Sequence, residues 1–203
     1  MISIVIPTYN NLKYLKLCIE SLAKNSSHFH EIVFHINDGS DGTLEYIKEN
    51  NFKYTFSDNN IGLCSAINKA VKITTSKFIL YAHDDMYFCP HWDNFLFDEI
   101  KRYDHDKFYL SGTMIEPYSG HITFNCGNEI DDFQEKKLLD NIDKLEYYDH
   151  QGTHFAPHLV SRNMWDIVGG FSEEFNPGIG SDPDFNMKLW KNGERIFKGL
   201  NKF

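Results

Sequence analysis

The sequence predicts an α/β protein with a mostly parallel central sheet flanked by helices, a Rossmann-like arrangement whose C-terminal half is irregular. Two observations predict it. Short β-branched runs alternate with amphipathic stretches in which apolar residues recur every three or four positions. The spacing of this alternation is that of right-handed βαβ units, which join parallel strands of one sheet. After residue 90 the alternation loosens.

The regular pattern covers residues 1–90. The first strand is a continuous β-branched run closed by Pro7, and such a run is typical of a strand buried on both faces. The helix that follows begins after Asn10 or Asn11, and either asparagine is a suitable cap. The predicted strands are 2–6, 32–36, 53–56 and 78–81, and the predicted helices are 12–22, 42–50 and 62–74.

The second half, residues 91–203, has a weaker pattern. Residues 128–150 are acidic with few strand signals, and we expect a solvated loop or a short surface helix there. No linker or internal repeat divides the chain, so residues 1–203 are expected to form a single domain. The remaining predicted elements are strands at 108–115 and 121–126 and helices at 91–103, 161–167 and 182–191.

Composition excludes several classes of protein. The formal net charge is −9, with 29 acidic and 20 basic residues, so nucleic acid is not expected as a partner. Hydrophobic residues at 41% and charged residues at 24% are ordinary globular values, which exclude a disordered chain. The four cysteines form no C-x-x-C pair, so neither a zinc ribbon nor a redox dithiol is predicted.

The same features bear on location. The N-terminal residues contain no basic leader, and no apolar stretch approaches the roughly 20 residues that span a membrane. Cysteines without close partners are typical of reduced thiols in a reducing compartment. We therefore expect a cytoplasmic protein without a transmembrane segment. Peripheral membrane association stays open, and nothing in the sequence predicts the oligomeric state.

Polar residues follow three of the predicted strands. In an open parallel sheet, ligands bind beyond the carboxyl ends of the strands, and these ends meet at one edge. Two of the three clusters carry carboxylates, so we expect a binding site at this edge. The clusters are Thr8-Tyr9-Asn10, Asn37-Asp38 and His83-Asp84-Asp85.

The pair Asp84-Asp85 is the sharper of these signals. Adjacent carboxylates repel each other, and a divalent cation would supply the counter-charge, held by one or two carboxylates and by substrate phosphates. The alternative is that both cap a turn with solvated side chains. The sequence contains neither a P-loop nor a G-x-G-x-x-G fingerprint after a strand. Any bound phosphate must therefore be held by a metal ion and scattered donors.

A second acidic cluster, Asp182-Pro183-Asp184, opens a predicted helix. The structural interpretation makes Asp182 the helix cap, with Pro183 in the first turn. The functional interpretation makes a carboxylate of this cluster a general base that faces the metal site. For the other candidate side chains, a packing or surface role is favoured over ligand binding; these are His154, His158, Trp92, Trp165 and Trp190.

These residues together resemble a known family. The segments 4–10 and 37–43 resemble the opening of family 2 glycosyltransferases, which have the GT-A fold, and 59–62 with Asn68 resembles their Asn-x-Gly segment. His83-Asp84-Asp85 occupies the place of the family's D-x-D metal motif. The segments 169–171 and 180–184 are similar to its G-G-F and Glu-Asp blocks. These blocks occur in the family's order, and the resemblance runs from residue 2 to about residue 199.

The resemblance implies an inverting, metal-dependent glycosyltransferase of the hexosyltransferase type. It would move a sugar from a nucleoside-diphosphate sugar, with a UDP-sugar favoured, to a hydroxyl of a glycan or other acceptor. Residues 1–90 would form the nucleotide-binding half and 91–203 the acceptor-side half. The residues implied in nucleotide binding are Pro7, Thr8, Tyr9, Asn10, Asp38, Asn68, His83 and Asp84.

The resemblance also implies the remaining site residues. Asp84 and Asp85 would bind Mn²⁺ or Mg²⁺, which bridges the diphosphate and stabilises the leaving group. Asp182 would take the proton from the acceptor hydroxyl, and Asp184 is the alternative base. On the acceptor or sugar side the resemblance implies Gly169, Gly170 and Trp165.

Three departures from the family pattern matter. Ala82 stands where the first carboxylate of D-x-D belongs, and Ser181 where a Glu usually precedes the base. No histidine follows His158, although many relatives have a metal-binding histidine beyond the last helix. Either the chain is a piece of a longer protein or water completes the coordination. Two alternatives stay open: a sugar-phosphate nucleotidyltransferase, and a nucleotide-sugar binding module without catalysis.

Overall fold

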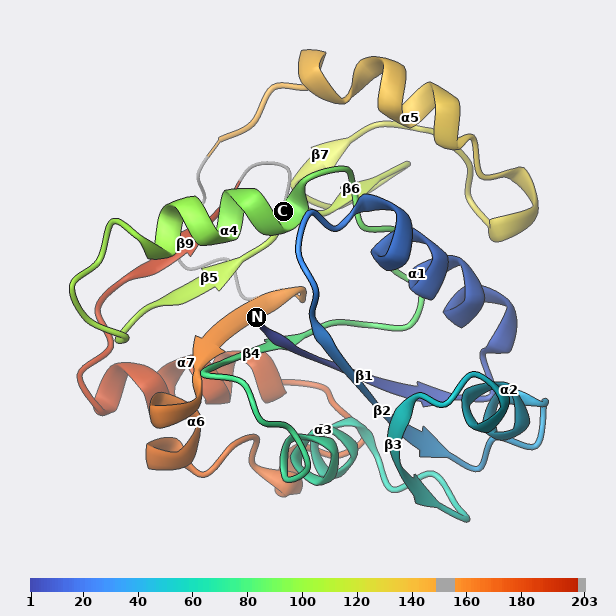
Figure 1. Ribbon diagram of the computed structural model, residues 1–203. Coiled ribbons are helices and arrows are strands. Elements are labelled where there is room, and N and C mark those ends of the chain that lie inside the picture. The colour runs from blue at the N-terminus through green and yellow to red at the C-terminus, as the bar shows by residue number, and fades with distance from the viewer. Residues whose placement is uncertain (149–155, 201–203) are drawn as a thin grey trace.

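A seven-stranded sheet forms the centre of the computed structural model, which describes residues 1–148 and 156–200 (Figure 1). The strand order is β3-β2-β1-β4-β8-β5-β9. β8 runs antiparallel to both its neighbours, and the other pairs are parallel, so the predicted mostly parallel sheet is confirmed. The strands are β1 (Ser3–Tyr9), β2 (Glu31–Asn37), β3 (Lys53–Ser57), β4 (Phe78–Tyr81), β5 (Tyr109–Ser111), β8 (His158–Ser161) and β9 (Phe197–Gly199).

β1 does not end at Pro7 as the sequence predicts, but continues to Tyr9. The reason is the side of the strand that Pro7 faces. Val5 accepts a backbone hydrogen bond from Ala82 on the β4 side, and Pro7, two residues on, faces that same side. β4 ends at Tyr81, opposite Val5, so no residue of β4 lies beside Pro7. The missing N–H of Pro7 therefore costs the sheet no hydrogen bond.

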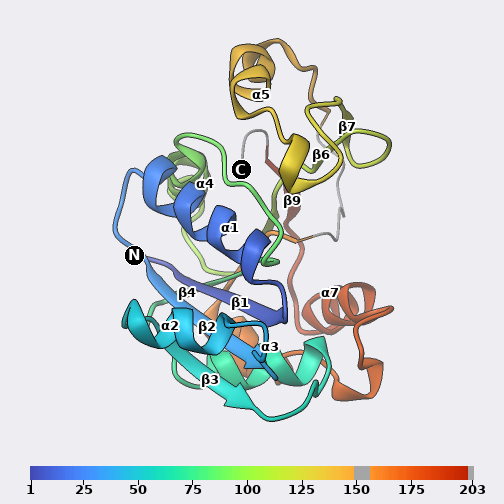
Figure 2. The same cartoon turned by 90° about the vertical axis from the view of Figure 1, so that its right-hand side faces the viewer.

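Helices cover both faces of the sheet (Figures 1 and 2). Because side chains alternate along β1, Ile4 and Ile6 pack into one hydrophobic cluster and Val5 into the other. The helices on the Ile4 face are α1 (Leu12–Asn25), α2 (Thr43–Glu49) and α4 (Trp92–Ile100). Those on the Val5 face are α3 (Leu63–Val71), α6 (Arg162–Val168) and α7 (Ser181–Lys191).

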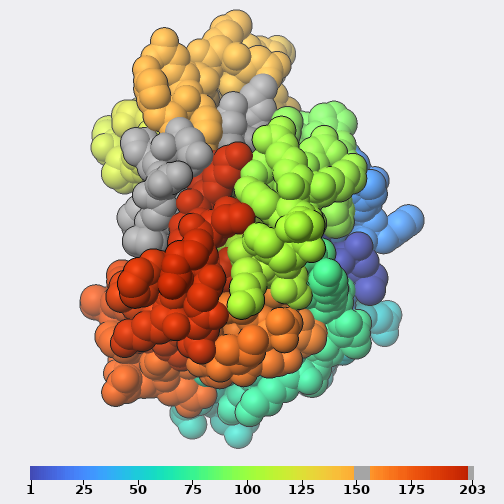
Figure 3. Space-filling view, turned by 90° about the vertical axis from the view of Figure 1, so that its left-hand side faces the viewer, coloured from blue at the N-terminus to red at the C-terminus, as the bar shows by residue number. Residues whose placement is uncertain are grey.

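The segment between β5 and β8 extends beyond the sheet. Of the strands predicted at 108–115 and 121–126, only short pieces form. For 128–150 the sequence left a solvated loop or a short surface helix open, and a short helix, α5, forms there. Figure 3 shows the segment with α5, in orange, projecting from the body of the molecule. Its elements are β6 (Ile115–Glu116), β7 (Ile122–Thr123), η1 (Ile130–Asp132), α5 (Glu135–Asn141) and η2 (Ile142–Lys144).

Two local predictions near the C-terminus are corrected. Asp182 is not the cap of α7: the helix begins at Ser181, and Gly180, whose φ of 83° suits glycine, is the N-cap. The short strand β9 was not expected; its three residues gain strand structure by pairing with β5. A further 3₁₀ turn, η3 (Glu173–Phe175), lies between α6 and α7.

Two other expectations concern bonding and membranes. The four cysteines form no disulfide in the structure, and Cys18, Cys64 and Cys126 are buried. Over residues 1–148 and 156–200, the helices are too short or too polar to cross a lipid bilayer.

Candidate active site

The ends of β1, β2 and β4 bring the three polar clusters together. The Nδ2 of Asn10 donates to Oδ2 of Asp38 at 3.0 Å, which links the first cluster to the second. The Nδ2 of Asn11 donates to Oδ1 of Asp84 at 3.1 Å, which links α1 to the third cluster. Asn11 is the N-cap of α1 but makes no side-chain cap hydrogen bond, and its Nδ2 is directed at Asp84 instead. The predicted common edge is therefore present in the structure.

The backbone at this edge is held in a restricted conformation. Asn10 and Asp38 have φ values of 47° and 64°, in the left-handed region that few residues other than glycine adopt. Asparagine and aspartate tolerate this region best, and strained residues of this kind cluster at functional sites. Pro7 and Thr8 are buried, whereas Tyr9 is half exposed beside the same edge. Of the residues predicted to bind the nucleotide, Tyr9 thus offers an accessible aromatic ring and Asp38 an accessible carboxylate.

Asp84 and Asp85 have different environments. Burial raises the pKa of Asp84, the Thr8 hydroxyl and the Asn11 amide oppose that rise, and the Asp85 charge adds to it. Asp85 is exposed, and its Oδ1 lies 3.9 Å from Nδ1 of His83. Carboxylate oxygens are the donors that Mg²⁺ and Mn²⁺ prefer, so the pair fits a divalent cation whose other ligands are phosphate and water. No group of three or more ligating side chains forms a complete metal site within the described residues.

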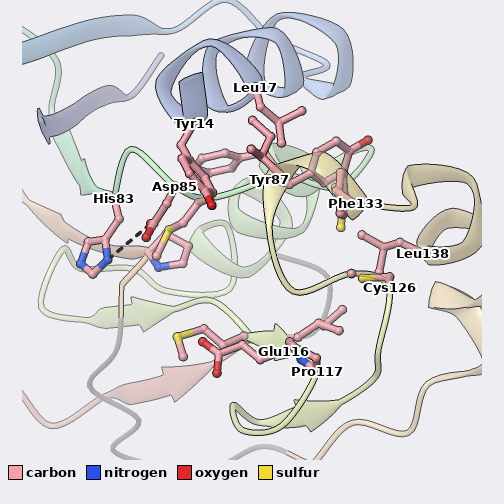
Figure 4. A pocket seen from close by; sticks show the side chains of 18 of the residues that line it. Tyr14, Leu17, His83, Asp85, Tyr87, Glu116, Pro117, Cys126, Phe133 and Leu138 are labelled. Carbon is pink, nitrogen blue, oxygen red and sulfur yellow. Dashed lines mark ion pairs between the residues drawn. The ribbon is translucent and has the colours of Figure 1, made fainter. Parts of the chain in front are cut away.

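A cavity of about 440 Å³ opens beside Asp85 (Figure 4). Tyr14 and Leu17 of α1 form one wall, and Glu116 with Pro117 lies across from them. The wall is mostly apolar, and the carboxylates in it are Asp85, Glu116, Glu129 and Asp182. No lysine or arginine is among the described residues that line it. An anionic ligand would therefore be repelled unless a cation accompanied it.

Asp182 reaches this cavity from the other half of the chain. It lies in the first turn of α7, where the helix N-terminus favours a carboxylate. Its side chain is 28% exposed, and its Oδ1 lies 3.4 Å from Nε2 of the buried His158. The alternative base, Asp184, accepts a hydrogen bond from Oγ of Ser172 at 2.6 Å and does not line the cavity. Of the two carboxylates, only Asp182 is thus placed with Asp85 and His83.

Of the predicted site residues, only His83, Asp85 and Asp182 line the cavity among the described residues. Asn68, Trp165, Gly169 and Gly170 lie neither in its wall nor at the sheet edge. Asn68 holds Phe171: its Nδ2 donates to the carbonyl oxygen at 2.8 Å, and its Oδ1 accepts from the backbone N–H at 2.9 Å. Trp165 is buried against Phe171 and Phe185, so its side chain fills the core. Gly169 and Gly170 form the bend after α6, and a Cβ on Gly170 would lie 2.5 Å from Oδ1 of Asn68. Asn68 and Trp165 thus contact the core around Phe171 rather than the cavity.

The far walls of the cavity come from 113–117 and 126–142, a region without motif or strong periodicity, so the sequence predicts no individual residue of these walls. His158 was expected to be a core or surface histidine, and it is indeed in the core, at 1% exposure. Its nearness to Asp182 could not be read from the spacing of the two residues. His154 lies outside the described residues.

Comparison with known proteins was made on sequence and on structure. The family model described as Glycosyl transferase family 2 matches residues 3–163. The chain is 29% identical, over its whole length, to a chondroitin synthase of Pasteurella multocida, and it spans 20% of that protein.

Two solved structures share the fold. S. aureus TarS 1–349 in complex with UDP superposes with a TM-score of 0.71 at 22% identity, over 98% of this chain and 57% of that one. The mannosyltransferase PcManGT of Pyrobaculum calidifontis, in complex with GDP-Man and Mn²⁺, has a TM-score of 0.65 at 16% identity, over 97% of this chain and 53% of that one.

Proposed function

The chain belongs to glycosyl transferase family 2, and from this we propose that it transfers a sugar from a nucleoside-diphosphate sugar to a hydroxyl group of a glycan acceptor, with inversion at the anomeric carbon. A UDP-sugar is the proposed donor. The observation that carries the proposal is that Asp85 and Asp182, from opposite halves of the chain, line one cavity. A single displacement needs a leaving-group stabiliser and a base on opposite sides of the sugar, and the two acidic clusters meet that need.

The donor side consists of the sheet edge. The accessible ring of Tyr9 and the carboxylate of Asp38 would hold the base and ribose, with Thr8, Asn10 and the backbone at Pro7 shaping the edge. Asp84 and Asp85 would hold Mn²⁺ or Mg²⁺, with His83 beside them. When bound, the cation neutralises the diphosphate and stabilises it as the leaving group. Carboxylates stand in the cavity wall, and no lysine or arginine is among its described lining residues, which supports this requirement for a cation.

The acceptor side is the cavity at Asp182. As the acceptor oxygen bonds to the anomeric carbon, the bond from that carbon to the diphosphate oxygen breaks, and Asp182 takes the hydroxyl proton. Asp182 is preferred over Asp184 because only Asp182 lines the cavity. Trp165, Gly169 and Gly170 would act on this side through packing, since they hold the segment before α7. The unpaired cysteines agree with a cytoplasmic location.

The test is the release of nucleoside diphosphate from a panel of nucleotide sugars in the presence of Mn²⁺. We expect turnover that falls about a hundredfold or more in Asp182→Asn, because the general base is lost while nucleotide binding survives. The matched control is Asp184→Asn, which removes a carboxylate of the same helix that faces Ser172, and it should retain most of the activity. Equal losses in both variants would reject the assignment of the base.

The same assay separates the alternatives. Release of pyrophosphate from a sugar phosphate and a nucleoside triphosphate would identify a nucleotidyltransferase. Tight nucleotide binding without turnover in any mixture would identify a binding module. Product analysis of the anomeric configuration tests inversion, because a single displacement from an α-linked donor gives a β-linked product.

A further inference from the structure

His158 is an ionisable residue buried at the centre of the sheet. It begins β8, where it pairs with Tyr81 of β4 and Ser111 of β5, and it is 1% exposed. Its ring lies among four aromatic rings, with centroid distances of 4.9 Å to Tyr109, 5.0 Å to Tyr81 and 6.0 Å to both Phe171 and Phe185. An aromatic hydrocarbon side chain would fill this space without the cost of burying two ring nitrogens.

The polar group that faces this ring is Asp182. Nε2 of His158 lies 3.4 Å from Oδ1 of Asp182, slightly beyond ordinary hydrogen-bond length. Both atoms are fully buried, and neither has a hydrogen-bond partner within the described residues. Hydrogen bonds of catalytic groups are commonly long before substrate binds and shorten in the complex. One hydrogen bond between His158 and Asp182 would therefore satisfy both buried atoms.

Among the described residues, Asp182 is the charged group within ion-pair distance of the His158 ring. The hydroxyls of Tyr81 and Tyr109 also face this region, and burial raises the pKa of both well above the usual value, so both stay neutral. The Cys64 thiol of α3 lies near Asp182, and burial raises its pKa as well. Asp182 is thus the anionic neighbour to which the imidazole N–H can donate.

The two oxygens of Asp182 have different environments. Oδ1 is buried toward His158, whereas the side chain as a whole is 28% exposed and lines the cavity. A donor fixed on Oδ1 would prevent rotation of the carboxylate and leave Oδ2 directed at the acceptor hydroxyl. In catalytic sites, a base is commonly oriented by a third group of this kind.

We propose that His158 is a positioning residue that holds Asp182 through a hydrogen bond from Nε2 to Oδ1 and directs Oδ2 at the acceptor. The proposal deepens the proposed function and rests on it for the role of Asp182. It assigns to β8 a task that the motifs of the chain do not suggest: β8 pairs with β4 and β5, and His158 at its start places an imidazole among the aromatic rings beside Asp182.

The kinetic test compares His158→Phe and His158→Gln. His158→Phe keeps the shape but removes the donor, so kcat should fall about tenfold or more, while KM for the donor sugar and the affinity for UDP stay within twofold. His158→Gln places an amide N–H near the position of Nε2, so it should recover most of the lost kcat. Unchanged kcat in a folded His158→Phe protein would overturn the proposal.

A double-mutant cycle separates positioning from general packing. In an Asp182→Asn background, His158→Phe should cause no further loss of kcat, because the group it positions is already absent. If His158→Phe lowers the residual kcat of Asp182→Asn by the factor seen in wild type, His158 acts independently of Asp182 and the proposal is wrong. Thermal unfolding of each variant reports whether packing has changed.

A third measurement does not depend on activity. In ¹⁵N-labelled protein, the His158 imidazole resonances, assigned by their loss in His158→Gln, should show a protonated Nε2 and should move in Asp182→Asn. Asp184→Asn is the matched control and should leave them in place. If wild type shows no turnover but these shifts occur, the proposed function fails and the positioning contact stands. If the resonances are indifferent to Asp182→Asn, the contact itself is absent.

Discussion

Among single residues, Glu194 is the carboxyl whose environment is least favourable to a charge. It is fully buried, and neither of its oxygens has a hydrogen-bond partner within the described residues. Burial raises its pKa from 4.5 to about 8, the Asp106 charge adds to the rise, and Lys107 opposes it. The folded state therefore retains the Glu194 proton to a higher pH than the unfolded state does.

The sign of the resulting pH dependence follows from this difference. Below pH 4.5 both states are protonated and Glu194 costs no stability; between pH 4.5 and about 8 the free energy of unfolding decreases as pH rises. We expect Glu194→Gln to raise the free energy of unfolding at pH 8 by on the order of 2 kcal/mol and to change it little at pH 4.5. Urea unfolding at both pH values measures this, with the exposed Glu174→Gln as control. An equal gain at both pH values would contradict the assignment.

Among the elements, the junction between α3 and the bend after α6 depends on one side chain. Asn68 forms hydrogen bonds to both the N–H and the carbonyl of Phe171, and Phe171 stacks on Phe185 of α7, the helix that carries Asp182. Gly170 is required here, because its φ of 68° and its closeness to Asn68 leave no room for a side chain.

This arrangement predicts that Asn68→Ala destabilises the protein. Two backbone groups of Phe171 would lose their partners, at a cost of about 2 to 3 kcal/mol in the free energy of unfolding. The loss should also lower kcat, because α7 is less well held, while UDP affinity should remain, since Asn68 does not line the cavity. Urea unfolding and UDP titration test both parts. The control is Lys72→Ala, one turn further along on the exposed surface; a large loss of UDP affinity in Asn68→Ala would restore the nucleotide role that the family resemblance implies.

For the whole molecule, the net charge of −9 bears directly on donor binding. The carboxylates that line the cavity, together with Asp84 beside it, repel a diphosphate at short range. We expect removal of divalent cations with EDTA to lower the affinity for UDP by at least about tenfold, an effect measured by titration calorimetry with and without Mn²⁺. Uridine, which has no phosphate, is the matched ligand and should bind equally in both conditions. UDP affinity that is insensitive to EDTA would contradict the role of Asp84 and Asp85.

Much of the first half could be predicted because its elements are encoded locally. The β-branched run of β1 and the apolar face of α1 are patterns within short segments, and their ends carry the polar clusters that the sheet edge collects. The second half contains β9, a strand of three residues that pairs with β5 and is too short to show a periodicity.

The sequence by itself determined the fold class, the family, the three polar clusters at one edge and the two acidic clusters as candidates. Only the tertiary structure decided which carboxylate faces the cavity, since Asp182 and Asp184 share a helix turn and differ in what packs against them. It also places Asn68 and Trp165 against Phe171, outside the cavity, and His158 against Asp182. The physical reason is that local patterns specify which face of an element is buried, whereas contacts between distant segments are set by how those elements pack.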